Sequence, residues 1–333
     1  MSRTSRSAAS MIWKEGYSQG ELMGKVFRVF RYLRTPLLLC TVLSAVISVP
    51  ATAQQIAFTW DDLPAHGALP AGETRVDVGR NLIAAMKKAH MPPAYGFVNG
   101  VQADREPLST PVLQMWRDAG LPLGNHTWSH PNLNQISLAD WQLDLLKNES
   151  VLQKYMGDGD WHWIRFPYLG EGETAQKRVA ARTFLAQHGY RIAAVTMSFA
   201  DYAYNEPYAR CVAKNDTAAI ARLETTYLDA AGAAAEYSRG MAKTLYGHDI
   251  PYVLLMHVGA FDARMLPRLL KLYRKRGFSF VTLEQAESDP FYKNDLDLSL
   301  SPVPDSLEEA TWTRGLPVPQ MPAPEIDLGS LCQ

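Results

Sequence analysis

The fold of this chain is decided by the stretch Ile56-Ala57-Phe58-Thr59-Trp60-Asp61-Asp62. Large apolar side chains occupy every second position, at Ile56, Phe58 and Trp60, which is the period of a half-buried β-strand. The carboxylates of Asp61 and Asp62 follow at the carboxyl end of this strand. In folds built on parallel strands that end of the sheet carries the chemistry, so we expect the functional site to lie there.

Short β-like runs alternate with longer helical patterns along the rest of the chain, which is typical of a parallel sheet covered by helices. Six further strands are expected at residues 95–98, 121–124, 163–166, 191–197, 253–256 and 278–282. Helices are expected over about 75–90, from Pro111 onward, from a cap at Ser137 to about Met156, and over 263–276. The pattern therefore predicts an α/β fold, a distorted (β/α) barrel with about seven parallel strands.

The residues that follow two of these strands can bind a metal ion. His126 and His130 are four positions apart, and neutral imidazole together with carboxylate suits zinc. With Asp62 as the third ligand, one coordination position stays open for water, whose pKa the cation lowers toward about 7. Asp61 is expected to act as the base, because adjacent side chains on a strand point apart and cannot easily share one ion. The expected cofactor is a divalent metal, Zn²⁺ first and Co²⁺ or Mn²⁺ as alternatives.

Five segments, taken in order, resemble the motifs of the polysaccharide deacetylases with a NodB homology domain, carbohydrate esterase family 4. They are Thr59-Trp60-Asp61-Asp62-Leu63, His126 through His130, Arg165-Phe166-Pro167-Tyr168, Asp201-Tyr202 and Leu255-Met256-His257. Tyr202 stands where the family has Trp, and Leu63-Pro64 replaces the usual Gly after the paired acids. The resemblance spans roughly residues 55–286 and implies a NodB-type deacetylase fold.

The remaining site residues are assigned roles on this basis. Arg165 is expected to hold Asp61 by a charge-assisted hydrogen bond, which can be either single or bidentate. The Tyr168 backbone N–H is expected to stabilise negative charge on the acetyl oxygen. His257 is expected to protonate the leaving group, with Asp201 orienting its imidazole and raising its pKa. The resemblance further implies that Leu255 and Tyr202 line the pocket for the acetyl methyl group.

The resemblance implies a hydrolase that removes acetyl groups from N-acetylglucosamine units of a glycan, such as peptidoglycan, a chitooligosaccharide or an exopolysaccharide. Two other functions stay open: an O-acetyl esterase acting on acetylated xylan, and a catalytically dead carbohydrate-binding protein. The joint presence of metal ligands, base and acid argues against a catalytically dead carbohydrate-binding protein. A formal net charge of −1 gives no reason to expect a nucleic-acid partner.

The amino terminus has the pattern of an export signal. Basic residues precede an apolar run over residues 37–49, and Ala51-Thr52-Ala53 has the small-x-small form of a cleavage site. We expect residues 1–53 to be removed, with Met23 as a candidate true start, and the mature protein to be secreted or periplasmic without a stable membrane span. A retained membrane anchor is the alternative.

The mature chain is expected to divide into a deacetylase domain over residues 54–289, with a helical insertion at about 203–250, and a Pro-rich extended tail over 290–333. Cys211 and Cys332 are the cysteines left after cleavage. Export permits a disulfide between them, but spacing alone leaves the bonded and the free forms equally open.

Overall fold

A computed structural model describes residues 54–302, 306–324 and 326–333 of the chain. The predicted export signal, with the candidate start at Met23, lies outside the described residues and stays a prediction. Within the described ranges, no helix is both long enough and apolar enough to cross a membrane.

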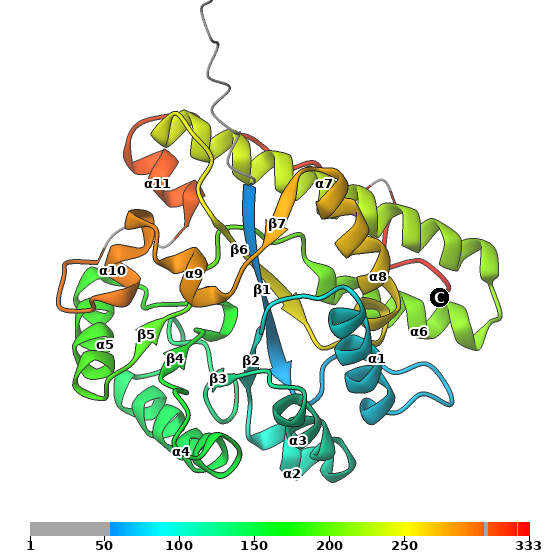
Figure 1. Cartoon of the computed structure of the whole chain (residues 1–333), viewed down its shortest axis with the longest axis horizontal. Coiled ribbons are helices and arrows are strands. Elements are labelled where there is room, and N and C mark those ends of the chain that lie inside the picture. The colour runs from blue at the N-terminus through cyan, green and yellow to red at the C-terminus, as the bar shows by residue number, and fades with distance from the viewer. Residues whose placement is uncertain (1–53, 303–305, 325) are drawn as a thin grey trace, which may run out of the picture. The chain divides into compact units, whose positions relative to one another are not determined.

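The described residues contain one sheet in which every strand pair is parallel (Figure 1). Its strands are β1 (Gln54–Leu63), β2 (Tyr95–Val98), β3 (Leu123–Asn125), β4 (Trp163–Ile164), β5 (Arg191–Ile192), β6 (Tyr252–His257) and β7 (Phe278–Phe280). They run in the order β5-β4-β3-β2-β1-β6, and β7 pairs with the first residues of β1 on the side away from β6. The predicted α/β fold with seven parallel strands is confirmed.

The sheet curls because the chain beyond β5 returns to β6. The strand predicted over residues 191–197 ends at Ile192, but Met197 N–H donates to Val253 O at 3.1 Å and Leu255 N–H donates to Met197 O at 3.0 Å. A single bridge between Met197 and Leu254 thus takes the place of a continuous strand. The distorted, incomplete barrel expected from the sequence is the result.

Helices pack around the sheet, and several of them begin at a side-chain cap. The α-helices are α1 (Arg75–Lys88), α2 (Val101–Arg105), α3 (Pro111–Asp118), α4 (Leu138–Met156), α5 (Ala175–Gln187), α6 (Asn205–Ala213), α7 (Thr217–Tyr246), α8 (Ala260–Lys275), α9 (Leu283–Glu287), α10 (Lys293–Leu296) and α11 (Leu307–Thr313). Short 3₁₀ turns are η1 (Pro107–Ser109), η2 (Pro167–Leu169), η3 (Asp201–Tyr204) and η4 (Pro290–Tyr292). The predicted cap is present: the Ser137 hydroxyl accepts the Asp140 N–H at the start of α4.

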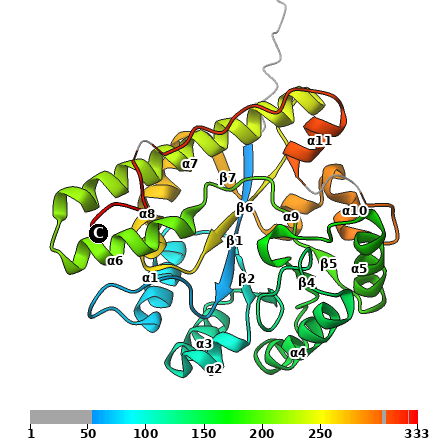
Figure 2. The same cartoon turned by 180° about the vertical axis from the view of Figure 1, so that it is seen from behind.

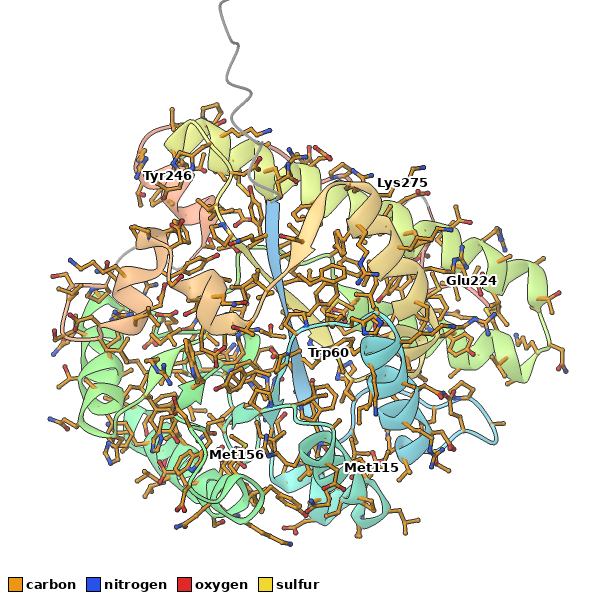
Figure 3. The ribbon with its side chains drawn as sticks, in the orientation of Figure 1. Trp60, Met115, Met156, Glu224, Tyr246 and Lys275 are labelled. Carbon is orange, nitrogen blue, oxygen red and sulfur yellow. A yellow bond between two sulfur atoms is a disulfide. The ribbon has the colours of Figure 1, made fainter. Side chains whose placement is uncertain are left out.

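Strand alternation separates the core from the barrel interior. Ile56, Phe58 and Trp60 of β1 are buried in the largest apolar cluster, against the surrounding helices, and Trp60 (labelled in Figure 3) meets Trp116 of α3 edge to face. The alternate residue Ala57 belongs instead to the smaller cluster that includes Phe97, Trp163 and Val253. Thr59 and Asp61 share the face of Ala57, so Asp61 stands at the carboxyl end of the barrel interior.

The predicted insertion is helical, since α6 and α7 fill it. The tail differs from expectation: α10 and α11 form within it, and only after about residue 315 do the described residues lack helix and strand. A prediction from proline content missed these helices because both lie between the prolines. Figure 2 shows the last segment running back along α7, and a disulfide joins Cys211 of α6 to Cys332, with Cα atoms 5.1 Å apart.

Candidate metal centre and active site

The three predicted metal ligands meet beyond the carboxyl ends of β1 and β3. Their ligand atoms all lie within 4.8 Å of one another. Asp62 Oδ1 is 3.6 Å from His126 Nε2 and 3.5 Å from His130 Nε2. Ligand atoms about 2.1 Å from a tetrahedral ion lie about 3.4 Å from each other, so this donor set fits a zinc ion in both chemistry and size.

Both carboxylates of the Asp61-Asp62 pair face this centre, although neighbouring residues on a strand normally point apart. Asp61 Oδ2 lies 3.6 Å from the same His126 Nε2. The backbone explains the arrangement, because Asp62 has a φ of +66°, in the left-handed region. Because of this left-handed turn, the side chains of Asp61 and Asp62 do not point to opposite sides as they would on a regular strand. Both carboxylates therefore lie near His126.

The imidazole of His126 is fixed with its Nε2 toward the carboxylates. Its Nδ1 lies 2.7 Å from the backbone oxygen of Arg165, and because a carbonyl oxygen only accepts, Nδ1 carries the proton. The lone pair is then on Nε2, which is the form that binds a metal ion. His130 follows in an irregular turn with a φ of +61°, and Pro131 after it disfavours a helical conformation at His130.

The electrostatics favour the ligand forms of these groups. Burial alone would raise the pKa of Asp62, but a hydrogen bond from His66 and the nearby imidazoles of His126 and His130 bring it well below its usual range. Burial, followed by the nearby imidazole of His126, lowers the pKa of His130 to about 4. At neutral pH the site thus offers an ionised carboxylate and a neutral imidazole from His130.

Arg165 lies under the site, fully buried, and contacts Asp61 through one nitrogen. Nη1 is 3.4 Å from Asp61 Oδ1, so the bidentate geometry left open by the sequence does not form. Its other N–H groups donate to Thr59 Oγ1 at 3.0 Å and to the backbone oxygens of Ala193 and Ala194 at 2.7 and 3.3 Å. The guanidinium therefore ties β1 to the chain leaving β5, and Asp61 receives only one of its contacts.

His257 and Asp201 form the second polar group of the site. His257 Nδ1 lies 3.0 Å from Asp201 Oδ1, and the His257 backbone N–H donates to Asp201 Oδ2 at 2.6 Å. Burial acts to lower the pKa of His257, but the charge and hydrogen bond of Asp201 outweigh it and raise the pKa to about 10. His257 pairs with Asp61 across β6 and β1, so a protonated imidazole stands next to the predicted base.

Two tyrosines flank the centre with largely exposed side chains. Tyr168 is 68% exposed, and its ring meets that of His130 at 4.6 Å; Tyr202 is 51% exposed, and its ring lies 5.2 Å from that of His257. Leu255 shares the strand face of His257 and is buried outside the apolar clusters of the described core. All the predicted site residues thus come from the carboxyl-terminal side of the sheet.

One residue of the site was missed. His66 is not among the residues that the sequence predicts for the site, yet its Nδ1 lies 2.7 Å from Asp62 Oδ2, and its ring is 4.7 Å from that of His257. Its position four residues after Asp62 was the available signal. A loop carries no periodicity, so the spacing alone could not show that the chain folds back on itself.

A comparison with protein-family models finds a match over residues 48–193, to the model described as polysaccharide deacetylase. Residues 48–193 thus have the pattern of a polysaccharide deacetylase domain. This match confirms the family resemblance over the first three of the five motifs, and the family is one of hydrolases.

Among curated proteins, the deacetylase domain is similar to a peptidoglycan-N-acetylglucosamine deacetylase of Bacillus cereus, at 28% identity over 121 residues. The match covers 36% of this chain and 38% of the relative, so it spans well under half of either protein. Solved structures with a similar fold include a family 4 carbohydrate esterase from Streptomyces lividans, with a TM-score of 0.44, 18% identity and coverage of 70% of this chain and 95% of that one. Another is a family 4 pseudoenzyme from Bacillus anthracis, with a TM-score of 0.48, 14% identity and coverage of 71% and 66%.

The family match ends before four of the predicted site residues. Asp62, His126, His130 and Arg165 lie inside residues 48–193, whereas the four residues beyond them are Asp201, Tyr202, Leu255 and His257. The structure of the deacetylase domain joins the two sets, because β6 pairs with β1 along six residues and sets His257 opposite Asp61.

Proposed function

We propose that this protein is a metal-dependent deacetylase that removes the acetyl group from N-acetylglucosamine units of a glycan. The observation that carries the proposal is the convergence of Asp62, His126 and His130 within 4.8 Å, next to Asp61 and to the pair formed by His257 and Asp201. The family match supports the same chemistry.

Asp62, His126 and His130 would hold the ion, with zinc as the metal that their oxygen and nitrogen donors suit best. When bound, zinc lowers the pKa of a water molecule toward about 7 and polarises the carbonyl of the acetyl group. The protein's part is to keep these donors fixed, which the bond from His126 Nδ1 to the Arg165 backbone oxygen does for one of them.

Asp61 and His257 then handle the protons of the hydrolysis. Asp61 accepts a proton from the attacking water as its oxygen bonds to the acetyl carbon, and the carbon–nitrogen bond breaks. His257 donates a proton to the departing nitrogen, so the products are acetate and the free amino sugar. Asp201 keeps His257 protonated, since its charge and hydrogen bond raise the pKa of that imidazole to about 10.

The substrate is assigned to the exposed face between the two tyrosines. The Tyr168 N–H would stabilise negative charge on the acetyl oxygen, and Leu255 with Tyr202 would line the pocket for the methyl group. Exposed aromatic rings on both sides of the centre give a sugar chain apolar faces on which to lie. Together with the predicted export signal, this favours a cell-wall or extracellular glycan as substrate and a secreted or periplasmic location.

The test is acetate release by residues 54–333, supplied with zinc, cobalt or manganese, from N-acetylglucosamine oligomers, peptidoglycan and acetylated xylan. Asp61→Asn should keep zinc but lose about 10²- to 10⁴-fold in kcat, the usual contribution of a general base. His126→Ala should lose zinc, whereas the control His248→Ala alters an exposed imidazole at the other end of β6 and should change neither.

Each result separates the candidate functions. Release from xylan alone would favour the O-acetyl esterase, and glycan binding without release from any substrate would favour the carbohydrate-binding protein. An Asp61→Asn variant with full turnover would remove Asp61 from the role of base.

A further inference from the structure

The carboxylate of Asp62 divides its two oxygens between different partners. Oδ1 faces both predicted histidine ligands, at 3.6 Å from His126 Nε2 and 3.5 Å from His130 Nε2. Oδ2 lies on the other side, 2.7 Å from His66 Nδ1. A metal ion among the three ligands can therefore be reached by Oδ1 only.

The direction of the His66 bond follows from chemistry. A carboxylate that binds a metal ion is ionised and can only accept hydrogen bonds, so His66 Nδ1 is the donor. Its proton occupies Oδ2, which then cannot swing toward the ion to make a second bond. Hydrogen bonds of this kind orient ligating carboxylates and tune the affinity of a site.

The loop that carries His66 is fixed from both sides, independently of Asp62. Arg75 Nη1 donates to the His66 backbone oxygen at 2.7 Å, while its Nε and Nη2 bind both oxygens of Glu106 at 2.8 and 3.0 Å. On the opposite side Gly67 has a φ of +65°, and a Cβ there would come within 3.0 Å of the Cβ of Asn205. The backbone that carries the imidazole is thus held by contacts that do not involve Asp62.

We propose that His66 is a positioning residue that fixes Asp62 as a monodentate ligand and thereby sets the metal affinity of the site. The proposal rests on the proposed function insofar as it takes Asp62, His126 and His130 to be the metal ligands. It is independent of the substrate and of the acetyl chemistry.

His66 also touches its neighbours through its ring, which lies 4.7 Å from that of His257 and 6.5 Å from that of Tyr202. Two substitutions separate the ring from the donor. His66→Phe keeps a ring against His257 and removes the N–H, whereas His66→Asn places an amide N–H where Nδ1 stands and removes the ring. His248→Phe makes the same chemical change at an exposed site remote from the centre and is the matched control.

The measurement is the zinc affinity of the mature full-length chain without substrate, by competition with a chromophoric chelator. We expect His66→Phe to weaken zinc binding by about 10- to 100-fold, the usual effect of removing such a partner, and His66→Asn to stay within about threefold of the parent protein. Visible spectra of the cobalt-loaded proteins give a second readout, because a bidentate Asp62 would raise the coordination number in His66→Phe and weaken the absorption.

The outcomes are distinct. Zinc affinity unchanged in His66→Phe, or lowered equally in His66→Phe and His66→Asn, would overturn the proposal, since neither result depends on the donated hydrogen bond. Failure of the parent protein to bind zinc would instead refute the ligand set of the proposed function.

Discussion

Removing the charge of Asp201 should move the alkaline limit of activity by several pH units. Asp201 raises the pKa of His257 to about 10, against the lowering effect of burial. The rise from 6.5 corresponds to about 5 kcal/mol of interaction favouring the protonated imidazole. Asp201→Asn keeps the volume and one hydrogen-bond acceptor but removes the charge that raises this pKa most. Burial then lowers the pKa of His257 against only the weaker charges of Asp62 and Asp61.

The sign follows from the role of His257 as the acid. Activity requires the protonated form, which is complete below the pKa and lost above it, so the parent enzyme should keep its activity up to about pH 10. A return of the pKa to the ordinary 6.5 would leave only about 3% of the imidazole protonated at pH 8. Asp201→Asn should therefore lose up to about 30-fold in kcat/KM at that pH and recover as the pH falls. The pH profile of kcat/KM for both proteins is the assay.

Asp262 offers a matched control for this experiment. Its carboxyl is buried beside Asp201, with Tyr227 and Asn205 as hydrogen-bond partners, and burial together with the charge of Asp201 raises its pKa well above the usual range. Because Asp262 accepts hydrogen bonds from Asn205 and Tyr227 and not from His257, Asp262→Asn should leave the alkaline limit in place. An alkaline limit that stays unmoved in Asp201→Asn would refute the acid role of His257 or its dependence on Asp201.

Three further predictions concern stability and metal binding. Arg165→Met leaves the buried Asp61 without its cation and should lower the free energy of unfolding by about 3–5 kcal/mol, measured by denaturant titration; an unchanged midpoint would contradict the ion pair. Cys332→Ser removes a cross-link that closes 121 residues, so it should lower the unfolding free energy by at most about 5 kcal/mol. It should also make the chain after residue 315 the first site of proteolysis, and equal resistance with and without the disulfide would speak against this anchoring role. Zinc at a hundred times its Kd should stabilise the parent protein by about 2.7 kcal/mol, seen as a higher Tm, and should leave His126→Ala unchanged; equal shifts in both would place the ion elsewhere.

The repetitive parts of the fold were predictable from the sequence because each depends on a local rule. Period-two alternation located β1, and the serine cap located the start of α4. The order of the motifs predicted which residues would meet, since the carboxyl ends of parallel strands share one edge of the sheet. Long-range contacts made by irregular chain were not predictable, and these include the return of residue 197 to β6 and the placement of His66 against Asp62.

For the same reason, the sequence predicted which residues form the metal centre but not how the backbone arranges them. Asp62, Thr127, His130 and Tyr168 all have left-handed φ values between +57° and +66°, a conformation that costs residues other than glycine about 1–3 kcal/mol each. None of these positions is a glycine, so no local signal in the sequence marks the turns. The surrounding contacts must hold the backbone there: Thr127 N–H donates to Asn125 Oδ1 at 2.8 Å, and Asn99 donates to the backbone oxygens of His126 and Thr127. The buried amides of Asn99, just after β2, and Asn125, at the end of β3, thus keep the chain in the conformation that turns the imidazoles toward the paired carboxylates.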